Sequence, residues 1–497
     1  MKKELLDITK NSGIVFSGKM INVLFSLVFN IIVVRFLGPE IYGEFVYIFT
    51  IVNFLVIIAT MGVNKGLTKY IPIYLNRNEN KKLNAIIVFS FTSTFILSVI
   101  LIILLILFSK DIAAFVLKDI SLKNHLITMS FLIIIHSYFK LLNAIYVSFG
   151  YVKNLIKIKN ILQPLVKIVL FVILYFLGLK YYGILGSYYL SMIIMLYILL
   201  KFIKNDQNYN IRINLLNFKK ENKKLFKFSF PLFLSSFIGY FIVKTDIFMI
   251  GFLVDKESVG IYNIALRIAT MTSFVLYAFN TIFAPKISSL YERKKIDKLA
   301  NIYKVITRWA LSINLIFFSI ILLFSKEIMH IFGKELIVGA IPLIVVSIGQ
   351  VMNVSAGPVG YMNTMTGHPE YEFYNNIFLV IINIVLNLIL IPVYGIMGAA
   401  IASAVSFTVS NIIKLLLLFK NTKIHPYNFD YIKLIISMIL AYFMVFFLKN
   451  LIIFHWFFRL ICFSFLFFCF FIIIYYLFGF SEEDKILIEA ITKKIKR

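Results

Sequence analysis

The sequence has few charged residues and almost no cysteine. Only 15% of its 497 residues are charged and 61% are hydrophobic, whereas soluble domains average about 25% charged and about 45–50% apolar residues. The core of a soluble protein is too small to bury so many apolar residues, so we expect lipid to surround most of the chain. Cys462 and Cys469 alone exclude a disulfide framework and a zinc cluster built on thiolates. We expect them to pack on one helix face.

The motifs of common enzyme sites are also absent from the sequence. It contains no Walker loop, no Gly-x-Gly-x-x-Gly at a strand–helix junction, no His-Glu-x-x-His and no Gly-x-Ser-x-Gly. The outer loops are short and no Asp-x-Asp occurs, which disfavours a membrane glycosyltransferase or polymerase. We therefore expect a protein that is not an enzyme, with no catalytic residues, no cofactor, no metal site and no ATP-driven transport within this chain.

Long, continuous apolar runs dominate what is present. A membrane-spanning helix needs about 20 mainly apolar residues, and an open sheet edge cannot lie in lipid, so the runs predict helices. The expected fold class is an all-α integral membrane protein with about 14 transmembrane helices. The spans are predicted at roughly 14–34, 44–63, 84–108, 126–149, 155–178, 183–203, 228–251, 259–284, 304–324, 338–362, 374–392, 396–419, 431–448 and 452–479.

The basic residues gather on alternate loops. If the N-terminus is cytoplasmic, the cytoplasmic segments hold 35 of the 50 Lys and Arg residues and the outer loops hold ten. This is the positive-inside pattern, which predicts an even number of spans, both termini in the cytoplasm and residence in the cell membrane. Topology and contact with anionic lipids then account for the net charge of +27, without a nucleic-acid partner.

Three short motifs recur in the same order in both halves of the chain. A polar turn at Arg35-Phe-Leu-Gly-Pro-Glu-Ile-Tyr-Gly43 corresponds to the turn at 251–262. Tyr182-Gly-Ile-Leu-Gly186 corresponds to Tyr394-Gly-Ile-Met-Gly398, and Gly150 corresponds to Gly367. Six spans per repeat predict two parallel six-helix bundles related by a pseudo-twofold axis along the membrane normal.

The repeat suggests boundaries for the parts of the chain. We expect an N-terminal lobe at 1–203, a cytoplasmic linker at 204–227, a C-terminal lobe at 228–420, two extra helices within 431–479 and a cytoplasmic tail at 480–497. The extra helices are strongly aromatic, which is typical of a pair that faces lipid.

The turn at 35–43 resembles that of the Wzx-type polysaccharide-biosynthesis flippases, whose superfamily includes multidrug MATE exporters and the lipid II flippase. Asp246 in span seven, followed by Gly260-Ile-Tyr262 at the start of span eight, is similar to the same family. The resemblance implies two six-helix bundles around a central cavity that opens alternately to the two sides of the membrane. It also implies transport of a lipid-linked oligosaccharide.

Ionisable residues within predicted spans are the candidate site residues, because burial in lipid costs roughly 2.5–3.5 kcal/mol each unless they face a cavity or a partner. Cations lining a cavity would suit a phosphate or pyrophosphate head group. The candidate substrate-binding residues are Lys19, Lys140, Arg267, Lys244, Lys167, Asn22, Asn53 and Arg35. Asp246 is the candidate for ion coupling or for a structural lock.

Other readings of these residues stay open. For Arg35 and Lys167 the alternative to a substrate contact is extension toward a membrane interface. Inward-facing amides, including Asn383 and Asn387, could contact sugars or hydrogen-bond between helices. His136 fits a hydrogen-bonded neighbour of Lys140 better than a proton carrier.

Two transport functions follow from the pattern. The first is a flippase with a cationic cavity, working by alternating access as a monomer among membrane lipids, with functionally linked glycosyltransferases. The alternative is a MATE-type antiporter for organic cations. It is disfavoured because spans one to six contain no deep acid. The turn at 35–43 is expected to belong to the outer gate.

Overall fold

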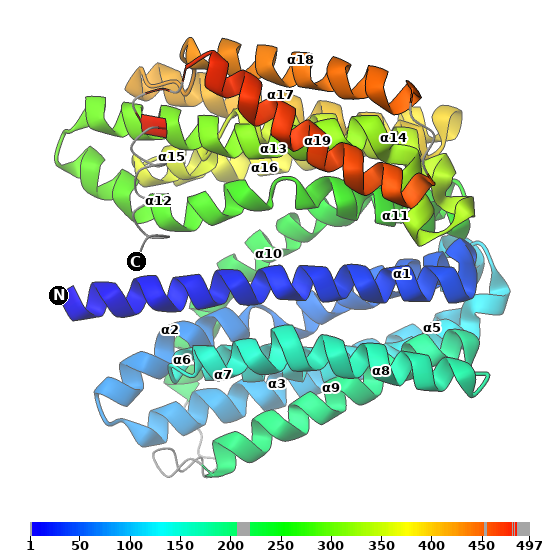
Figure 1. Cartoon of the computed structure of the whole chain (residues 1–497). Helices are drawn as coiled ribbons and strands as arrows, with labels where there is room; N and C mark the ends of the chain where they lie inside the picture. The colour runs from blue at the N-terminus through cyan, green and yellow to red at the C-terminus, as the bar shows by residue number, and fades with distance from the viewer. Residues whose placement is uncertain (1, 206–218, 452–454, 480, 482, 485–497) are drawn as a thin grey trace. The chain divides into compact units, whose positions relative to one another are not determined.

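A computed structural model describes residues 2–205, 219–451, 455–479, 481 and 483–484. The described chain is helical, which confirms the all-α membrane fold class (Figure 1). Residues 206–218 of the predicted linker and most of the predicted tail at 480–497 lie outside the described residues. The helices are α1 (Lys2–Thr60), α2 (Val63–Asn76), α3 (Asn80–Leu107), α4 (Ser109–Asp111), η1 (Ile112–Val116), η2 (Ile120–Leu122), α5 (Lys123–Ser130), α6 (Leu132–Ser148), α7 (Val152–Ile156), η3 (Lys157–Leu162), α8 (Gln163–Phe176), α9 (Lys180–Asn205), α10 (Lys219–Leu253), α11 (Lys256–Met271), α12 (Phe274–Glu292), α13 (Ile296–Phe332), η4 (Lys334–Gly339), α14 (Ala340–Ser355), α15 (Val359–Met365), α16 (Pro369–Tyr394), α17 (Ile396–Thr422), α18 (Asp430–Leu451) and α19 (Trp456–Leu477).

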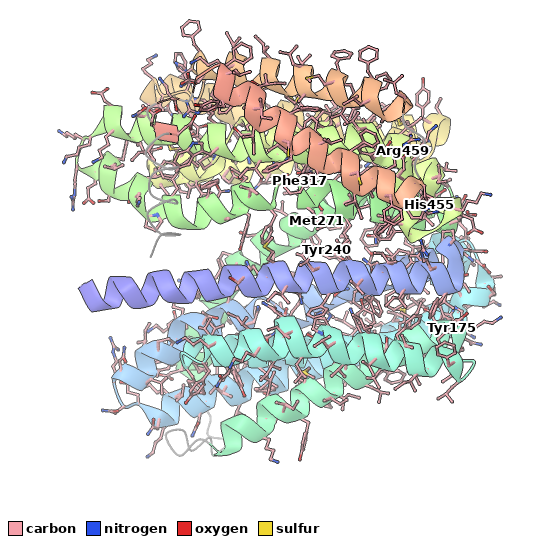
Figure 2. The ribbon with its side chains drawn as sticks, viewed as in Figure 1. Tyr175, Tyr240, Met271, Phe317, His455 and Arg459 are labelled. Carbon is pink, nitrogen blue, oxygen red and sulfur yellow. The ribbon has the colours of Figure 1, made fainter. Side chains whose placement is uncertain are left out.

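Twelve helices in the described residues are long and apolar enough to cross a membrane, and thirteen if the bent pair α11 and α12 counts as one span. The first of them, Ser17–Thr60, covers most of two predicted spans, 14–34 and 44–63. Gly38 interrupts its helical backbone with φ 81° and ψ 167°. Many large apolar side chains project outward, among them Phe317 on α13, which is 48% exposed (Figure 2). The predicted count of fourteen stays a prediction.

The described contacts divide the chain into two compact units, 1–260 and 261–497. In the first unit α6 packs against α1, α2, α3 and α9, so its side chains form the middle of the core. Leu132, Ile133 and Tyr146 are fully buried there. The helix α10 also packs on α1 and α2 within this unit. The predicted lobe boundaries at 203 and 228 stay predictions.

In the second unit α14 packs against both α13 and α17, and α16 pairs with α17 along its length. A buried amide joins α16 to α17: the Asn375 amide donates to the Ser410 hydroxyl at 2.6 Å. Asn387 donates to Asn383 within α16 at 3.1 Å. The Asn375 bond joins two helices, whereas the Asn387–Asn383 bond lies within one, so both roles of Asn383 and Asn387 stay open. Helices α18 and α19 pack on α13 through Val445, Phe463 and other apolar side chains.

Local geometry supports the sequence repeat. Gly150 follows α6 with φ +83° and Gly367 follows α15 with φ +105°. In both turns the next N–H donates five residues back, from Tyr151 to Tyr146 and from His368 to Asn363, each at 3.0 Å. This is the Schellman helix end, for which glycine is the favoured residue.

The side chains at these turns also form equivalent contacts. The Tyr146 hydroxyl donates to the Leu199 carbonyl on α9 at 2.9 Å. The Asn363 amide donates to the Lys414 carbonyl on α17 at 3.1 Å. Each half of the chain therefore ties the end of its fourth predicted span to its sixth by one hydrogen bond from a side chain to the backbone.

The two repeated turns meet backbone to backbone through glycine. A Cβ atom on Gly43 would overlap the Lys256 carbonyl, and one on Gly260 would overlap the Pro39 carbonyl. Both glycines are buried. The absence of a side chain at these positions lets the start of α11 lie directly on the first turn.

We predict that Gly43→Ala destabilises the protein, because the new methyl group must displace the Lys256 backbone. Overpacking of this kind costs typically about 1–3 kcal/mol. The melting temperature of the purified protein should fall. The matched control is Gly239→Ala in α10, where a Cβ meets nothing within 4 Å and alanine favours the helix. Equal melting temperatures for wild type and Gly43→Ala would contradict the close contact.

Candidate functional site

Three lysines from membrane-spanning segments of the first unit come together. Lys19 lies on α1, Lys140 on α6 and Lys159 on the π-helical segment η3. The charge of Lys159 lies close enough to interact with Lys19 and also with Lys140. We name Lys19, Lys140 and Lys159 the lysine cluster. Two of its members, Lys19 and Lys140, were predicted from the sequence, and each interacts with the third member, Lys159.

Close helix packing holds the lysine cluster together. A Cβ atom on Gly18 would overlap the Ile156 side chain and lie 3.1 Å from the Asn160 amide, so α1 lies directly against α7 and η3. One turn later the Asn22 amide donates to the Lys159 carbonyl at 3.5 Å. The predicted residue Asn22 therefore lies at the cluster, beside Lys19 on the same helix.

The α6 side of the cluster carries polar atoms that lack partners. His136 and Asn143 lie one turn before and one turn after Lys140 on α6. The His136 Nδ1 and Asn143 Oδ1 atoms are buried without a hydrogen-bond partner among the described residues. Because such atoms normally find partners, this face is suited to a polar ligand or to water.

Arg267 belongs to the second unit, beside a break in a membrane span. The pair α11 and α12 bends by 46° after Met271. Side chains hold the break: Ser273 donates to Gln350 at 2.5 Å, and Asn314 donates to Thr272 at 3.0 Å. Interrupted spans commonly line substrate or ion sites in transporters, because the freed backbone groups need polar surroundings. Arg267 is half-buried one turn before the break.

Lys167 contacts aromatic rings and is not a member of the lysine cluster. Its ammonium lies 4.0 Å from the Phe29 ring centroid and 4.4 Å from that of Tyr188. Such cation–π contacts stabilise a partly buried lysine. They favour a structural role for Lys167 over substrate binding.

The other predicted residues occupy varied surroundings. The Asn53 amide donates to the Phe49 carbonyl of its own helix at 2.9 Å. Arg35 is exposed, Lys244 is half-buried and Asp246 is 5% exposed on α10. The substrate role of Asn53, Arg35 and Lys244, and the lock or coupling role of Asp246, stay predictions.

An ion-pair network lies beside the repeated turns of the first unit. The Lys256 ammonium pairs with Asp119 and, at 3.4 Å, with Glu44. The Glu44 carboxylate also lies 3.7 Å from the His125 ring, which stacks on Tyr181 with centroids 3.7 Å apart. Hydrogen bonding to Lys256 lowers the pKa of Asp119 to about 2. The network ties the start of α11 to the η1–η2 connection and to α1.

Two functional candidates were missed by sequence reasoning. Lys159 and Arg308 lie inside predicted spans, but both were counted with the basic cytoplasmic segments. Arg308 is 1% exposed and donates to Asp430 at 2.7 Å and to Asp484 at 2.9 Å. The Asp484 carboxylate also accepts hydrogen bonds from the Trp309 indole at 2.8 Å and from the Tyr475 hydroxyl at 3.0 Å. Arg308 therefore joins α13 to α18 and to the segment after α19, and position inside a span was the available signal.

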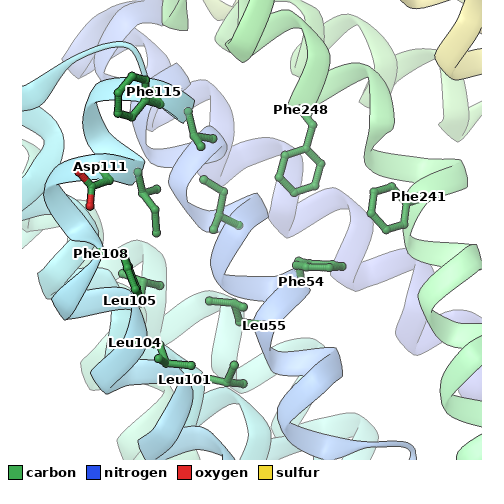
Figure 3. A pocket seen from close by; sticks show the side chains of 13 residues that line it. Phe54, Leu55, Leu101, Leu104, Leu105, Phe108, Asp111, Phe115, Phe241 and Phe248 are labelled. Atoms are coloured by element: carbon green, nitrogen blue, oxygen red, sulfur yellow. The ribbon is translucent and has the colours of Figure 1, made fainter.

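An apolar pocket of about 680 Å³ opens in the first unit (Figure 3). Its lining comes from α1, α3, η1, α10 and the connection after α3. Phe54, Phe108, Phe115, Phe241 and Phe248 provide much of this lining, and Asp111 is the charged residue among the lining side chains. The surface suits a hydrocarbon chain better than a sugar.

Comparison with known proteins identifies relatives of the chain. A family described as "Polysaccharide biosynthesis protein" matches residues 8–291, and one described as "MatE" matches 231–389. The chain is 31% identical over 198 residues to the probable low-salt glycan biosynthesis flippase Agl15 of Haloferax volcanii, covering 39% of this chain and 41% of that protein. The probable flippase AglR of the same organism is 30% identical over 176 residues, covering 34% and 36%. These matches span less than half of each relative.

Solved transporter structures share the fold. The lipid II flippase MurJ in an inward closed conformation superposes with a TM-score of 0.68 at 18% identity, covering 94% of this chain and 98% of that chain. An inward-facing multidrug MATE transporter gives 0.71 at 18% identity, covering 81% and 94%. At this identity the likeness concerns the fold alone.

We predict that Lys167→Gln lowers the stability of the protein by about 1 kcal/mol, the typical value of a partly buried cation–π contact. Lys167→Arg should retain most of the stability, because guanidinium also stacks on aromatic rings. The melting temperature of each purified variant measures the effect, and exposed Lys180→Gln is the control. Wild-type stability of Lys167→Gln combined with lost transport would assign Lys167 to the substrate instead.

A second prediction concerns Asp119. Since its pKa is lower in the folded protein than its ordinary value of 3.8, the carboxylate stabilises the fold above about pH 4 and loses this contribution as the pH falls toward 2. Asp119→Asn should lower the melting temperature at pH 7 and reduce its dependence on pH between 4 and 2. Exposed Asp111→Asn is the control. If the melting temperature of Asp119→Asn depended on pH as that of the wild type does, the Asp119–Lys256 ion pair would not be the cause of this dependence.

Proposed function

The chain belongs to the polysaccharide biosynthesis protein family, and from this membership we propose that it is a lipid-linked oligosaccharide flippase. Its substrate is an oligosaccharide on a polyprenyl phosphate or pyrophosphate. It moves this substrate from the cytoplasmic to the outer face of the cell membrane, for surface polysaccharide or glycoprotein glycan assembly. The two Haloferax volcanii relatives, both of which are named as probable flippases, support this assignment.

The observation that carries the proposal is the lysine cluster. Cations within membrane-spanning segments are costly, and cations placed beside one another add mutual repulsion. An anionic head group would relieve both costs while its sugars remain in a polar environment. Lysine ammonium groups are common phosphate ligands.

The second unit would contribute Arg267 to the same task. The break after α11 places the polar side chains of Thr272 and Ser273 within two turns of Arg267 along the chain. We propose that the protein exposes its cationic groups alternately to the two sides of the membrane, as the family resemblance implies. The head group then crosses through the protein while the polyprenyl chain stays in hydrocarbon.

The apolar pocket is consistent with an amphiphilic substrate. Its five phenylalanines lie on the same unit as the lysine cluster. A transporter for small hydrophilic sugars would have no use for such a lining, whereas a lipid-linked substrate carries a long hydrocarbon chain. The glycosyltransferases that build this substrate would be its functional partners.

The second candidate is a cation-coupled antiporter of the MATE type. The match of residues 231–389 to the MatE family and the buried carboxylate of Asp246 favour it. Expression of the protein in a drug-sensitive strain separates the two candidates. Protection against cationic dyes would favour the antiporter, and unchanged sensitivity would favour the flippase.

We predict that the triple variant Lys19→Gln, Lys140→Gln, Arg267→Gln loses translocation of the lipid-linked oligosaccharide while remaining folded. The physical reason is the loss of the positive charges that would hold the phosphate. In a gene-deletion strain carrying this variant, the lipid-linked oligosaccharide should accumulate on the cytoplasmic face. Periodate or lectin labelling of the outer face measures its distribution.

The matched control removes three exposed cations, Lys81, Lys180 and Lys298, in the same way. This control should translocate like the wild type, because its charges lie on loops and helix ends. Wild-type translocation by the first triple variant would overturn the proposed head-group site.

A further inference from the structure

We propose that Lys159, presented by the π-helical segment η3, binds the phosphoryl group of the transported lipid together with Lys19 and Lys140. This inference rests on the proposed function and adds to it a residue and a location. The phosphoryl site would then lie within the first unit, where α1, α6 and η3 converge.

The position of Lys159 is the first step of the argument. It is the member of the lysine cluster whose charge interacts with both of the others. The Asn22 amide bonds to its backbone carbonyl, and Gly18 allows α1 to approach η3 within contact distance. The backbone of Lys159 is therefore anchored to the helix that carries Lys19.

The second step concerns charge balance. Lys140 and Lys159 form no ion pair with any Asp or Glu in the part of the chain that the structure describes. Lys256, Arg308, Lys414 and Arg459 each have a carboxylate partner there. The protein thus pairs several of its other cations and leaves these two for an anion from outside the chain.

The third step is the backbone of η3. In a π-helix each N–H donates five residues back, so the turn holds one residue more than an α-helical turn and rotates the residues before it relative to those after it. Such insertions are frequent at functional sites. Here the insertion spans 157–162, so Lys159 lies within it, between α7 and α8.

The neighbouring residue Lys157 allows the effect of position to be separated from the effect of charge. It lies on the same π-helical segment as Lys159, and both lysines are exposed. Lys159 differs from Lys157 in that its charge interacts with Lys19 and Lys140 and its carbonyl accepts from Asn22. This makes Lys157 a matched control for every measurement on Lys159.

Phosphoryl is the ligand chemistry that the site fits. It offers several charged oxygens to donors arriving from three helical segments, and Asn22 and His136 supply uncharged polar groups beside them. A lipid monophosphate and a lipid diphosphate share this chemistry. Short prenyl chains dissolve in detergent and can be used to compare the two.

The experiment measures binding of farnesyl diphosphate, farnesyl monophosphate and farnesol to the purified full-length protein by calorimetry. We expect Lys159→Gln to weaken binding of at least one phosphate about tenfold, corresponding to the loss of one charge-assisted contact of about 1.4 kcal/mol. Lys157→Gln should bind like the wild type, and Lys159→Arg should recover most of the affinity. Farnesol binding should be the same for all variants.

The pattern of results decides the proposal. A larger loss for the diphosphate assigns the site to diphosphate-linked lipids, and a larger loss for the monophosphate assigns it to monophosphate-linked ones. Equal phosphate affinities for Lys159→Gln and Lys157→Gln would overturn the proposal. Elution of Lys159→Gln as a monodisperse peak, with a wild-type melting temperature, separates lost binding from lost folding.

The proposed function can fail separately. If phosphate binding depends on Lys159 but the wild-type protein moves no lipid-linked oligosaccharide in cells, the site stands and the flippase assignment falls. If the wild type translocates the lipid while Lys159→Gln binds and translocates like Lys157→Gln, the flippase assignment stands and Lys159 has no part in it.

Discussion

The cost of holding positive charge in a membrane is the constraint on which the structure depends. A lysine or arginine within a spanning segment needs a carboxylate, an aromatic face or a ligand. The chain uses the first solution at Arg308, which is enclosed by carboxylates, and the second at Lys167, which lies between two aromatic rings. Lys140 and Lys159 of the lysine cluster have neither a carboxylate partner nor a cation–π contact in the part of the chain that the structure describes. This contrast directs attention to the cluster as the place for an external anion.

Glycine provides the close contacts that position these charges. Gly18 brings α1 onto η3, and Gly43 and Gly260 bring the repeated turns onto each other. The ion pairs of Lys256 with Glu44 and Asp119 then form around the second contact. Packing without side chains thus determines which charged groups become neighbours, since a larger residue at any of these positions would separate the helices.

Much of the fold followed from local properties of the sequence. Continuous apolar runs predicted membrane helices, and the fold class and family were confirmed. The glycines of the repeat were also informative, because Gly150 and Gly367 end helices with the same hydrogen bonds. Counting spans was less certain, since Gly38 interrupts one helix and α11 and α12 form a bent pair. Hydropathy averages over such breaks and cannot place them.

The sequence by itself determined that this is a helical membrane protein with repeated motifs and several cations within its predicted spans, because apolar length and charge position are local properties. Only the tertiary structure decided which groups each of these cations contacts. Lys140 and Lys167 look alike in the sequence, yet one joins the lysine cluster and the other lies on aromatic rings. Lys159 was counted with a basic cytoplasmic segment, although it lies inside a predicted span, and η3 places it beside α1. Helix packing brings together residues that are more than a hundred positions apart, and hydropathy contains no information on those distances.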